Sequence, residues 1–566
     1  MTFLQVANRA VSKLTTDVSA TDTSLTITTG DGVLFPTGNF VITIDDERIL
    51  VGSRSGDTFS SLTRGYDGTT AASHTAGTRV ELRIIARHIQ ELQDFCNTAG
   101  QPNGLATLDT NGKVVQDPAS LTNIVFCNHY SDPADAIADI GTNNATLIVS
   151  SPQTCNRNFT VPSNVKVKFE RGGQWIINSG VTITFNGQIE AGVWQIFGGS
   201  GTITGFANVP EGYPEWWGAA GDDIHDDTIP IQKAIDSGLG KVVFTKSVYK
   251  TTNSINIGSP HGVCSLIGKP PQVKIHNTDN SKDIIAIGSS VTYIAIENFY
   301  LYHDSVGTGN GISITGSGGN SFHNAFRHIY IQSCNNAFYS TNGFMNTLEN
   351  VQCNQSNVGF YIQGGTTWNL VDCYAANITN AGYNLQQVGY SALINCAVDN
   401  GNGANPYIFN SCQGVSLIGC GAEQNTNIPG YTGLIDCNNS QVSIVGFVSY
   451  NNSGGSGSAV LKGINNSTIR VSAFYELSCP TLNKYYIDSG ASLVIADAVF
   501  TNASGVEGSG KVIDMTTGNI ILYGGGIVYT PTSAPSSPPI GTVYYDSSAQ
   551  KLKVYTSSGW QTISSS

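Results

Sequence analysis

A short pattern of an apolar residue, a variable residue and a cysteine recurs along the second half of this 566-residue chain. Four copies follow one another at spacings of 20, 23 and 24 residues, as Val351-Gln352-Cys353, Val371-Asp372-Cys373, Ile394-Asn395-Cys396 and Ile418-Gly419-Cys420. Two further copies follow after 27 and 26 residues with other apolar residues in place of cysteine, Val445-Gly446-Phe447 and Val471-Ser472-Ala473. Repeats of this length, rich in strand formers and separated by Gly and Asn, are typical of a solenoid of stacked parallel strands.

This repeat length is too short for helical repeats, and the pattern lacks the Leu and Asn consensus of leucine-rich repeats. In a solenoid, each turn buries its inner row of side chains against the neighbouring turns. We therefore predict that the four cysteines stack inside the solenoid, with the Val and Ile residues two places earlier forming a second inner column. The spacing of the twelve cysteines favours buried thiols over disulfides.

Charged residues make up only 12% of the chain, whereas hydrophobic residues reach 40%, enough to form a core. The formal net charge of -13 argues against a nucleic-acid partner, because phosphate binding needs clustered Lys and Arg. No Lys or Arg lies between Arg327 and Lys462. That interval also disfavours an anionic partner held by charge alone.

The amino terminus lacks the apolar segment of a signal peptide, and no stretch is long and apolar enough to span a membrane. We therefore expect a soluble protein that is not inserted in a membrane or exported by the usual route. Short alternating runs followed by a helical pattern over 84–96 predict an all-β head domain that ends in a helix. The predicted divisions are a head domain (1–97), a linker (98–122), a β-rich region (123–212), the solenoid (213–530) and a small β module (531–566).

A short helix is expected just before the solenoid repeats. Asp226 or Asp227 can cap it, and Pro230 suits its first turn. Ile231, Ala234 and Ile235 would form its apolar face, which could cover the open end of the solenoid.

Two acidic residues follow the cysteine pattern at the same offset. Alternate residues of a strand face opposite sides, so inward Ile418 and Cys420 would place Glu423 outward. The same count places Asp399 outward one turn below, and adjacent strands lie about 4.8 Å apart. Tyr450 and Glu476 would occupy the next two rungs of this outer column.

Such a column has the residues that glycoside hydrolysis needs. Two neighbouring carboxylates without a nearby cation raise the pKa of one of them, as a general acid requires. We predict Glu423 as the acid and Asp399 as the base or nucleophile, with Glu476 as an alternative partner. Asp372 would lie on the order of 14 Å from Asp399 along a straight strand. The alternative is that these acids only keep a polar wall soluble.

Several aromatic residues lie in the same turns and can stack on sugar rings, or else plug the ends of the turns. These candidates are Trp368, Tyr374, Tyr390, Tyr407 and Tyr450. The acidic run at 222–227 lacks the spacing of an EF-hand calcium loop, and turn formation explains it better. His303, His323 and His328 lack the spacing of zinc ligands. No metal and no cofactor are therefore predicted.

Four stretches resemble parts of phage tail proteins. RGYDGTTAASHTAGTRVELR resembles an amino-terminal module of tail structural proteins, and NGLATLDTNGKV resembles a connector of tail fibres. YPEWWGAAGDDIHDDTIPIQKAID is similar to the segment at which pectate-lyase-like right-handed β-helices begin, those of tailspikes included. IGTVYYDSSAQKLKVYTSSGWQTI resembles a short carboxy-terminal β module of phage fibres.

The resemblance implies a homotrimeric tailspike whose right-handed parallel β-helix meets a host surface polysaccharide, either capsule or lipopolysaccharide. Its head domain would attach to other phage tail proteins, which places the protein in the virion tail after synthesis in the host cytoplasm. Many such spikes cleave the polysaccharide. The alternatives are a receptor-binding fibre without activity, a polysaccharide lyase, disfavoured by the missing Arg or Lys base, and a bacterial surface or secreted β-helix.

Overall fold

The structure is a computed structural model of the whole chain. It describes residues 3–98, 107–108, 114–115, 123–206, 208–258, 262–269, 271–315, 321–488, 490–501, 506–507, 511–514, 521–523, 540, 543–546 and 548–563. The chain divides into two compact units, Met1–Thr122 and Asn123–Ser566. The predicted linker over 98–122 lies largely outside the described residues.

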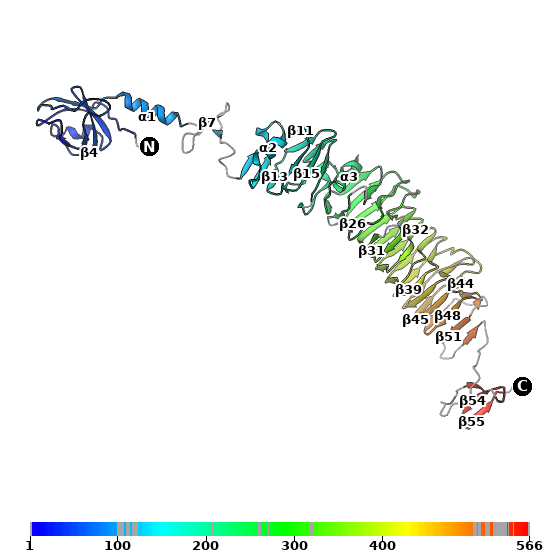
Figure 1. The fold of residues 1–566 in the computed structure, drawn as a ribbon. Helices are drawn as coiled ribbons and strands as arrows, with labels where there is room; N and C mark the ends of the chain where they lie inside the picture. Colours follow the sequence, from blue (N-terminus) through cyan, green and yellow to red (C-terminus); the bar gives the residue numbers. More distant parts are fainter. Residues whose placement is uncertain are drawn as a thin grey trace. The chain divides into compact units, whose positions relative to one another are not determined.

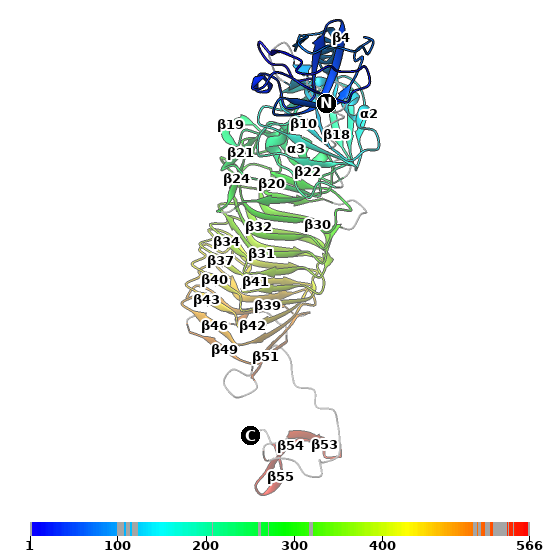
Figure 2. The same cartoon turned by 90° about the vertical axis from the view of Figure 1, so that its left-hand side faces the viewer.

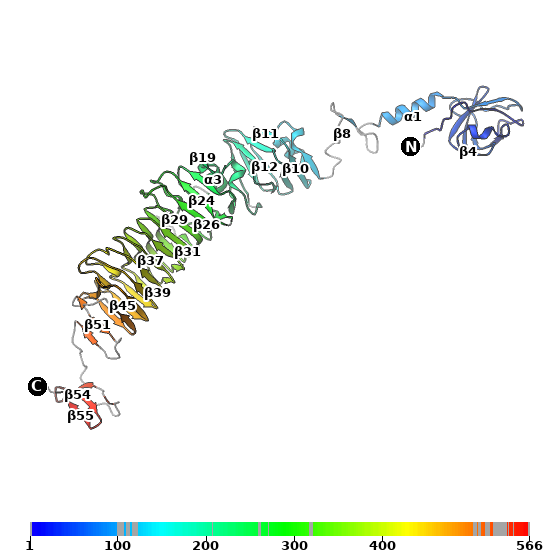
Figure 3. The ribbon, with the colours of Figure 1, turned by 180° about the vertical axis from the view of Figure 1, so that it is seen from behind.

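The first unit is built on an antiparallel sheet of six strands in the order β1-β6-β3-β4-β5-β2. It includes β4 and is drawn in blue in Figure 1. Its strands are β1 (Val11–Lys13), β2 (Ser24–Thr26), β3 (Phe40–Ile44), β4 (Glu47–Ser55), β5 (Thr58–Thr63) and β6 (Arg79–Glu81). Alternation of apolar and polar residues puts Phe40, Ile42 and Ile44 of β3 into its core. The helix expected over 84–96 is α1 (Ala86–Cys96), which follows the sheet (Figure 3). A short antiparallel pair, β7 (Thr107–Leu108) and β8 (Val114–Val115), comes next.

The second unit begins with parallel strands in three small sheets. The first sheet contains β9 (Ile124–Phe126), β10 (Ala145–Val149), β13 (Val165–Phe169) and β16 (Gln188–Glu190). The second contains β11 (Pro152–Cys155), β14 (Gln174–Ile177) and β17 (Phe197–Gly199). The third contains β12 (Phe159–Val161), β15 (Thr182–Phe185) and β18 (Thr202–Thr204). Helix α2 (Pro133–Ile140) packs against this region through Ala136, Ile137 and Ile140. The first solenoid turns therefore lie within the β-rich region expected at 123–212.

The main body is a sheet of 22 strands, parallel except for its last pair. Its strands before the site are β19 (Asp222–Asp226), β20 (Lys241–Phe244), β21 (Val248–Thr251), β23 (Ser265–Gly268), β24 (Val273–Asn277), β26 (Ala295–Tyr302), β29 (Ala325–Gln332) and β31 (Thr347–Asn354). Those that follow are β33 (Asn369–Val371), β34 (Tyr374–Ala376), β36 (Ala392–Ile394), β37 (Ala397–Asp399), β39 (Gln413–Ile418), β40 (Gly421–Glu423), β42 (Gln441–Val445), β43 (Val448–Tyr450), β45 (Thr468–Ser472), β46 (Phe474–Leu477), β48 (Ser492–Ile495), β49 (Ala498–Phe500), β51 (Lys511–Asp514) and β52 (Ile521–Tyr523).

A second sheet closes the opposite side of each turn. It contains β22 (Ile255–Ile257), β25 (Ile285–Ile287), β27 (Ile312–Ile314), β28 (Ser321–Phe322), β30 (Asn336–Phe344), β32 (Val358–Thr366), β35 (Ala381–Gln386), β38 (Asn405–Asn410), β41 (Gly433–Asn438), β44 (Ala459–Ile464), β47 (Asn483–Ile487) and β50 (Val506–Glu507). The chain winds through about 15 turns, with the strands of successive turns stacked above one another (Figure 2). This confirms the predicted parallel β-helix. None of the described helices is long and apolar enough to cross a membrane.

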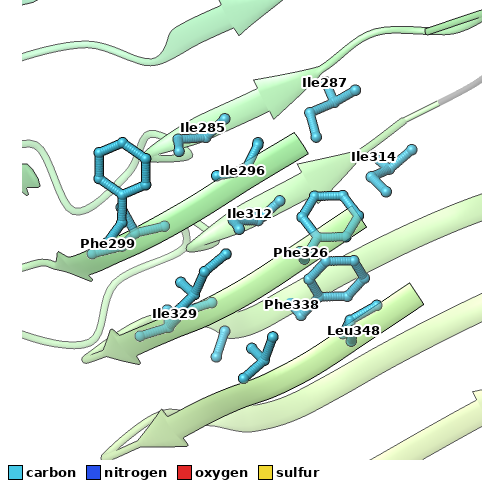
Figure 4. Close-up of a cluster of buried hydrophobic side chains, with 14 of the residues drawn as sticks. Ile285, Ile287, Ile296, Phe299, Ile312, Ile314, Phe326, Ile329, Phe338 and Leu348 are labelled. Carbon is cyan, nitrogen blue, oxygen red and sulfur yellow. The ribbon is translucent and has the colours of Figure 1, made fainter. Parts of the chain in front are cut away.

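The interior of the solenoid is filled by columns of large apolar side chains. Ile285, Ile312 and Phe338 come from one sheet, while Ile296, Phe326 and Leu348 come from the other, and they meet in the middle (Figure 4). Two turns further on, the inner rings of Tyr383 and Tyr407 stack 5.1 Å apart. Such stacking of identical positions is what a repeat with in-register strands produces.

Sharp corners separate the strands of each turn. At the corner that follows β33, β36, β39, β42 and β45, and at the matching position inside β31, one residue per turn has a left-handed backbone, with φ between 51° and 72°. These corner residues are Asn350, Asp372, Asn395, Gly419, Gly446 and Ala473. Asn, Asp and Gly adopt this conformation at the lowest cost, which explains their recurrence between the apolar residue and the cysteine.

The corners correct the predicted register in two places. A strand does not run through from Ile418 to Cys420, because Gly419 turns the chain between them; Cys420 is buried, whereas Ile418 points outward and is 41% exposed. Val371, Ile394 and Val445 align with Ile418, so the predicted inner column is wrong at these four positions, whereas Val351 and Val471 are buried as predicted. Cys373, Cys396 and Cys420 lie on successive rungs, as predicted, but Cys353 pairs with Ala375, two residues along the strand. All four thiols are free and buried.

The helix expected before the repeats is α3 (Thr228–Asp236), and it buries Ile231, Ala234 and Ile235 as predicted. Asp226 accepts a hydrogen bond from the Thr228 backbone amide at its start. Asp227 instead accepts from two backbone amides of the preceding loop. The remaining one-turn helices are η1 (Asp31–Leu34), η3 (Cys127–His129) and η4 (Pro214–Trp217).

The carboxy-terminal residues form a small sheet of their own. It consists of the antiparallel strands β53 (Val543–Asp546), β54 (Lys551–Thr556) and β55 (Gly559–Thr562). Tyr555 and Trp560 face each other across it, with ring centroids 5.0 Å apart. Part of the module expected at 531–566 lies outside the described residues.

Candidate functional site

The candidate site lies on one outer face of the solenoid, which we call the outer wall. It is formed by the outward side chains of β24, β34, β37, β40, β43 and β46 and of the second halves of β26, β29 and β31. The first six of these strands are labelled along one edge of the solenoid in Figure 2. Strand pairing aligns these side chains in two columns. The first is Lys274, Tyr300, Tyr330, Gln352, Tyr374, Ala397, Gly421, Val448 and Tyr475, and the second is His276, Tyr302, Gln332, Asn354, Ala376, Asp399, Glu423, Tyr450 and Leu477.

Asp399 and Glu423 are direct neighbours on this wall. They end β37 and β40 and pair in register, so their backbones lie about 4.8 Å apart. Tyr450 pairs with Glu423 on the next rung. Tyr374 pairs with Ala397, which puts its ring diagonally beside Asp399. The structure thus brings together four residues that the sequence singled out.

The two acids differ in their surroundings. Glu423 is exposed, whereas Asp399 is half-buried. Burial raises the pKa of Asp399, and the charge of Glu423 raises it further, while hydrogen bonding from Tyr374 opposes the shift. Burial and the neighbouring Asp399 raise the pKa of Tyr374 to about 12. At neutral pH, Tyr374 is therefore a hydrogen-bond donor at the edge of the acidic pair.

The nearest basic residues along the chain lie on other faces. Arg327 is in the first half of β29 and pairs with Glu297 and Glu349 at 2.8 and 3.2 Å. Lys462 is on β44 of the opposite sheet and pairs with Asp436 at 3.1 Å. Neither side chain belongs to the outer wall, so neither neutralises the pair of acids there.

Glu476, expected to continue the acidic column, points into the solenoid. It pairs with Ser449 instead of Tyr450, and its side chain is fully buried. Its carboxylate accepts hydrogen bonds from the backbone amides of Cys479 at 2.6 Å and Thr501 at 2.8 Å. The prediction was wrong because Val445 aligns with Ser472 and not with Val471, and a shift of one residue reverses the side of every following side chain.

Three of the expected sugar-binding aromatics lie elsewhere. Trp368 and Tyr407 are buried in the solenoid, and the Tyr407 hydroxyl donates to the carbonyl oxygens of Cys396 and Gly421. Tyr390 is 75% exposed but precedes β36 at a different corner. Tyr374 and Tyr450 are the two that face the outer wall.

Asp372 is not part of the wall either. It occupies the left-handed corner before β34, and its carboxylate accepts a hydrogen bond from Asn395, the corner residue of the next turn, at 3.2 Å. Its side chain is exposed. Asp372 therefore supports the corner and does not form a third acid with Asp399 and Glu423.

A group of polar and aromatic residues on the wall escaped the sequence-based search. The Tyr300 hydroxyl donates to Gln332 at 2.7 Å, and the Asn354 amide donates to the Tyr330 hydroxyl at 2.7 Å. The Lys274 ammonium lies 5.4 Å from the centre of the Tyr300 ring. In the sequence FYLY at 299–302 and IYIQ at 329–332, aromatic or polar residues alternate with apolar ones. This alternation could have shown that Tyr300, Tyr330 and Gln332 face outward.

The first rungs of the wall end in a charged cluster. The His276 ring is held between the carboxylates of Asp223 and Asp304, at 2.7 and 3.0 Å, and stacks on Tyr302 with ring centroids 4.4 Å apart. Within the described residues, no group of three or more His, Cys, Asp or Glu side chains is arranged to hold a metal ion. The wall thus offers hydrogen-bond donors, aromatic faces and one carboxylate pair.

No protein-family model matches the sequence, and no curated protein matches it. Among solved structures, a tailspike of Acinetobacter phage vb_AbaP_AS12 matches at 16% identity and a TM-score of 0.45, over 58% of this chain and 67% of the other. The enzymatically active domain of tailspike protein 2 of bacteriophage CBA120 matches at 16% identity and a TM-score of 0.35, over 54% of this chain and 47% of the other.

Phage tailspikes are among its structural neighbours. The A-module of the mannuronan C-5 epimerase AlgE6 from Azotobacter vinelandii also matches, at 14% identity and a TM-score of 0.35, over 54% of this chain and 98% of the other.

Proposed function

We propose that this protein attaches a phage virion to a host surface polysaccharide and hydrolyses that polysaccharide on the outer wall. The observation that carries the proposal is the in-register pair of Asp399 and Glu423, flanked by Tyr374 and Tyr450. Two carboxylates with different environments are what glycosidic hydrolysis requires. Exposed tyrosines beside them supply faces on which sugar rings stack.

We assign the roles of the two acids from their different surroundings. Asp399, whose pKa is raised, stays protonated more readily and serves as the general acid. Glu423 is then the nucleophile or base. This exchanges the two roles expected from the sequence, where the burial of Asp399 was not visible. Tyr374 holds the Asp399 side chain in place.

Strand pairing sets the two backbones about 4.8 Å apart, and side-chain reach allows either the carboxyl separation of about 5 to 5.5 Å of a retaining enzyme or the wider one of an inverting enzyme. In a retaining reaction the two acids would act in turn. Asp399 would give its proton to the glycosidic oxygen while Glu423 attacks the anomeric carbon, and the leaving sugar departs with that proton. Asp399 would then take a proton from water, whose oxygen replaces Glu423 at the anomeric carbon. The product would keep the anomeric configuration of the substrate.

The test is incubation of the purified full-length protein with capsule or lipopolysaccharide of the host, followed by chain-length analysis. Wild type should shorten the chains, and Asp399→Asn and Glu423→Gln should each slow cleavage by roughly 10²- to 10⁴-fold. Asp372→Asn is the matched control, since this acid lies at an exposed corner outside the pair. Equal cleavage by wild type and the Asp399→Asn, Glu423→Gln double variant would refute the assignment.

A second candidate is binding of the polysaccharide without cleavage. The tyrosine and amide columns from Tyr300 to Tyr374 favour it, because they offer stacking faces and hydrogen bonds beyond the acidic pair. In the same assay, this function would retain the polysaccharide on the protein at its full length. Elimination is disfavoured because Arg327 and Lys462 are paired on other faces.

For the first unit we propose attachment to other tail proteins, and for the whole protein a homotrimer.

A further inference from the structure

Helix α1 at the end of the first unit exposes its apolar side. None of its 11 residues is buried within the described part of the chain. Ile89 is 51% exposed and Leu92 is 54% exposed. Isolated helices shorter than about 12 to 15 residues are marginal in water, and most helices gain their stability by packing an apolar stripe. The described residues of a single copy do not provide that packing for α1.

The spacing of the stripe indicates what would cover it. Ile85, Ile89, Leu92 and Cys96 follow one another at intervals of four, three and four residues. This is the a and d spacing with which identical helices wind around one another in a coiled coil. A helix that packs on the flat core of its own domain commonly carries a wider stripe.

The polar residues of α1 fit the same arrangement. Arg87 pairs with Glu91, and Gln90 donates to Asp94 at 2.8 Å, so these side chains are engaged along the outside of the helix. The positions that border the stripe carry no formal charge at neutral pH; they are Ala86, His88, Gln93 and Phe95. Identical helices can therefore approach one another without repulsion between like charges.

The amino-terminal segment covers only one side of the helix. The Leu4 amide donates to Glu91 at 3.1 Å, and the Phe3 ring meets the edge of Phe95 with centroids 5.6 Å apart. Ile89 and Leu92 stay exposed in spite of these contacts. The uncovered part of the stripe is thus Ile89, Leu92 and Cys96, since Ile85 is buried.

We propose that α1 forms a parallel, in-register seam with the same helix of other copies of this chain. Parallel pairing places Ile89 against Ile89, Leu92 against Leu92 and Cys96 against Cys96. Antiparallel pairing would set Cys96 against Ile85, which is only 8% exposed. This inference does not depend on the chemistry at Asp399 and Glu423.

Cys96 gives a direct test in the full-length protein, because it is exposed while the other eleven cysteines are buried. Diamide would take two protons and two electrons from two Cys96 thiols, leaving one Sγ–Sγ bond and the reduced hydrazine. After N-ethylmaleimide quenching, a non-reducing denaturing gel should show a covalent dimer. A seam of two helices would convert nearly all chains, whereas a seam of three would leave about a third uncrosslinked, because disulfides form in pairs.

The variants separate a seam from chance collision. Cys96→Ser should abolish the dimer, and Ile89→Asp with Leu92→Asp should reduce its initial rate at least tenfold. Gln90→Glu, on the charged side of the helix, should leave the rate unchanged. Hydrogen exchange of β3 shows whether each variant keeps the first unit folded. Equal rates in wild type and in a folded Ile89→Asp, Leu92→Asp variant would overturn the proposal, as would crosslinking of Cys96 to an Ile85→Cys partner.

Discussion

At the scale of single residues, the side of the sheet on which an acid lies decides what it can do. Asp399 and Glu476 are both found near the ends of strands in the same sheet. Asp399 lies on the outer wall beside Glu423, at the place where we propose that the polysaccharide is bound. Glu476 lies inside and holds two backbone amides, so its role is to join turns of the solenoid.

A third acid, Glu47 in the first unit, makes the stability of that unit depend on pH. Its buried carboxylate contacts the Arg64 guanidinium at 2.8 and 2.9 Å and the His74 ring at 2.8 Å. Burial alone would raise its pKa, but hydrogen bonds from Arg64, His74 and two backbone amides outweigh it and lower the pKa from 4.5 to about 2. Because the pKa of Glu47 is lower in the folded state than in the unfolded state, its ionised carboxylate stabilises the fold at pH values above the unfolded-state pKa. That stabilisation is lost as the pH falls toward 2.

We therefore expect the first unit to lose about 3 kcal/mol of stability between pH 4.5 and 2. Hydrogen exchange of peptides from β3 and β4 in the full-length protein measures this loss. Glu47→Gln should be less stable than wild type at pH 7 and should change little over the same range. A wild-type protein whose exchange at pH 2.5 matches that at pH 6, after correction for intrinsic rates, would contradict the expectation.

At the scale of strands and corners, the corner residues set which side chains reach the outer wall. The sequence was sufficient to predict the repeat, the buried thiols and the neighbourhood of Asp399 and Glu423, because the strands themselves alternate regularly. It was not sufficient for Ile418 or Trp368, since a single left-handed residue between two strands resets the alternation. A one-residue difference in turn length had the same effect on Glu476.

Gly419 tests this account of the corners. Its φ is 64°, and Asn395 one turn below has a φ of 52°. An added Cβ would come within 2.7 Å of the Asn395 Oδ1 atom, which is the end of a side chain and can move. Left-handed backbone costs a residue with a β-branched side chain about 2 kcal/mol, whereas Asn tolerates it.

Gly419→Val should therefore lower the midpoint of thermal unfolding followed by circular dichroism, and Gly419→Asn should lower it much less. Ser416→Val provides a control for added bulk, because Ser416 faces outward from the neighbouring strand. Equal losses in the Val and Asn variants would show that crowding, and not the backbone conformation, limits the corner.

At the scale of the whole molecule, composition and fold combine to leave the outside of the solenoid almost without charge along its middle turns. Ile418, Val445 and Val448 are each more than 40% exposed close to the acidic pair. Exposed apolar patches next to a polar wall are typical of surfaces that meet another molecule. The homotrimer that we propose would use such surfaces.

Sedimentation equilibrium tests that assembly directly. We expect a species of about three times the chain mass of 59.8 kDa in native buffer. The measurement is best made at several protein concentrations and at high salt, because an association held by apolar contacts should persist there. A mass that stays at the value of one chain throughout would rule the trimer out.

The in-register stacking of the turns has one more consequence. Each turn of such a solenoid contacts only the turn before it and the turn after it, and the same corners close every turn. Whole turns can therefore be inserted or deleted during evolution as interchangeable modules, while Asp399 and Glu423 keep their relation to each other. The length of the solenoid can in this way change without altering the pair of acids to which we assign the chemistry.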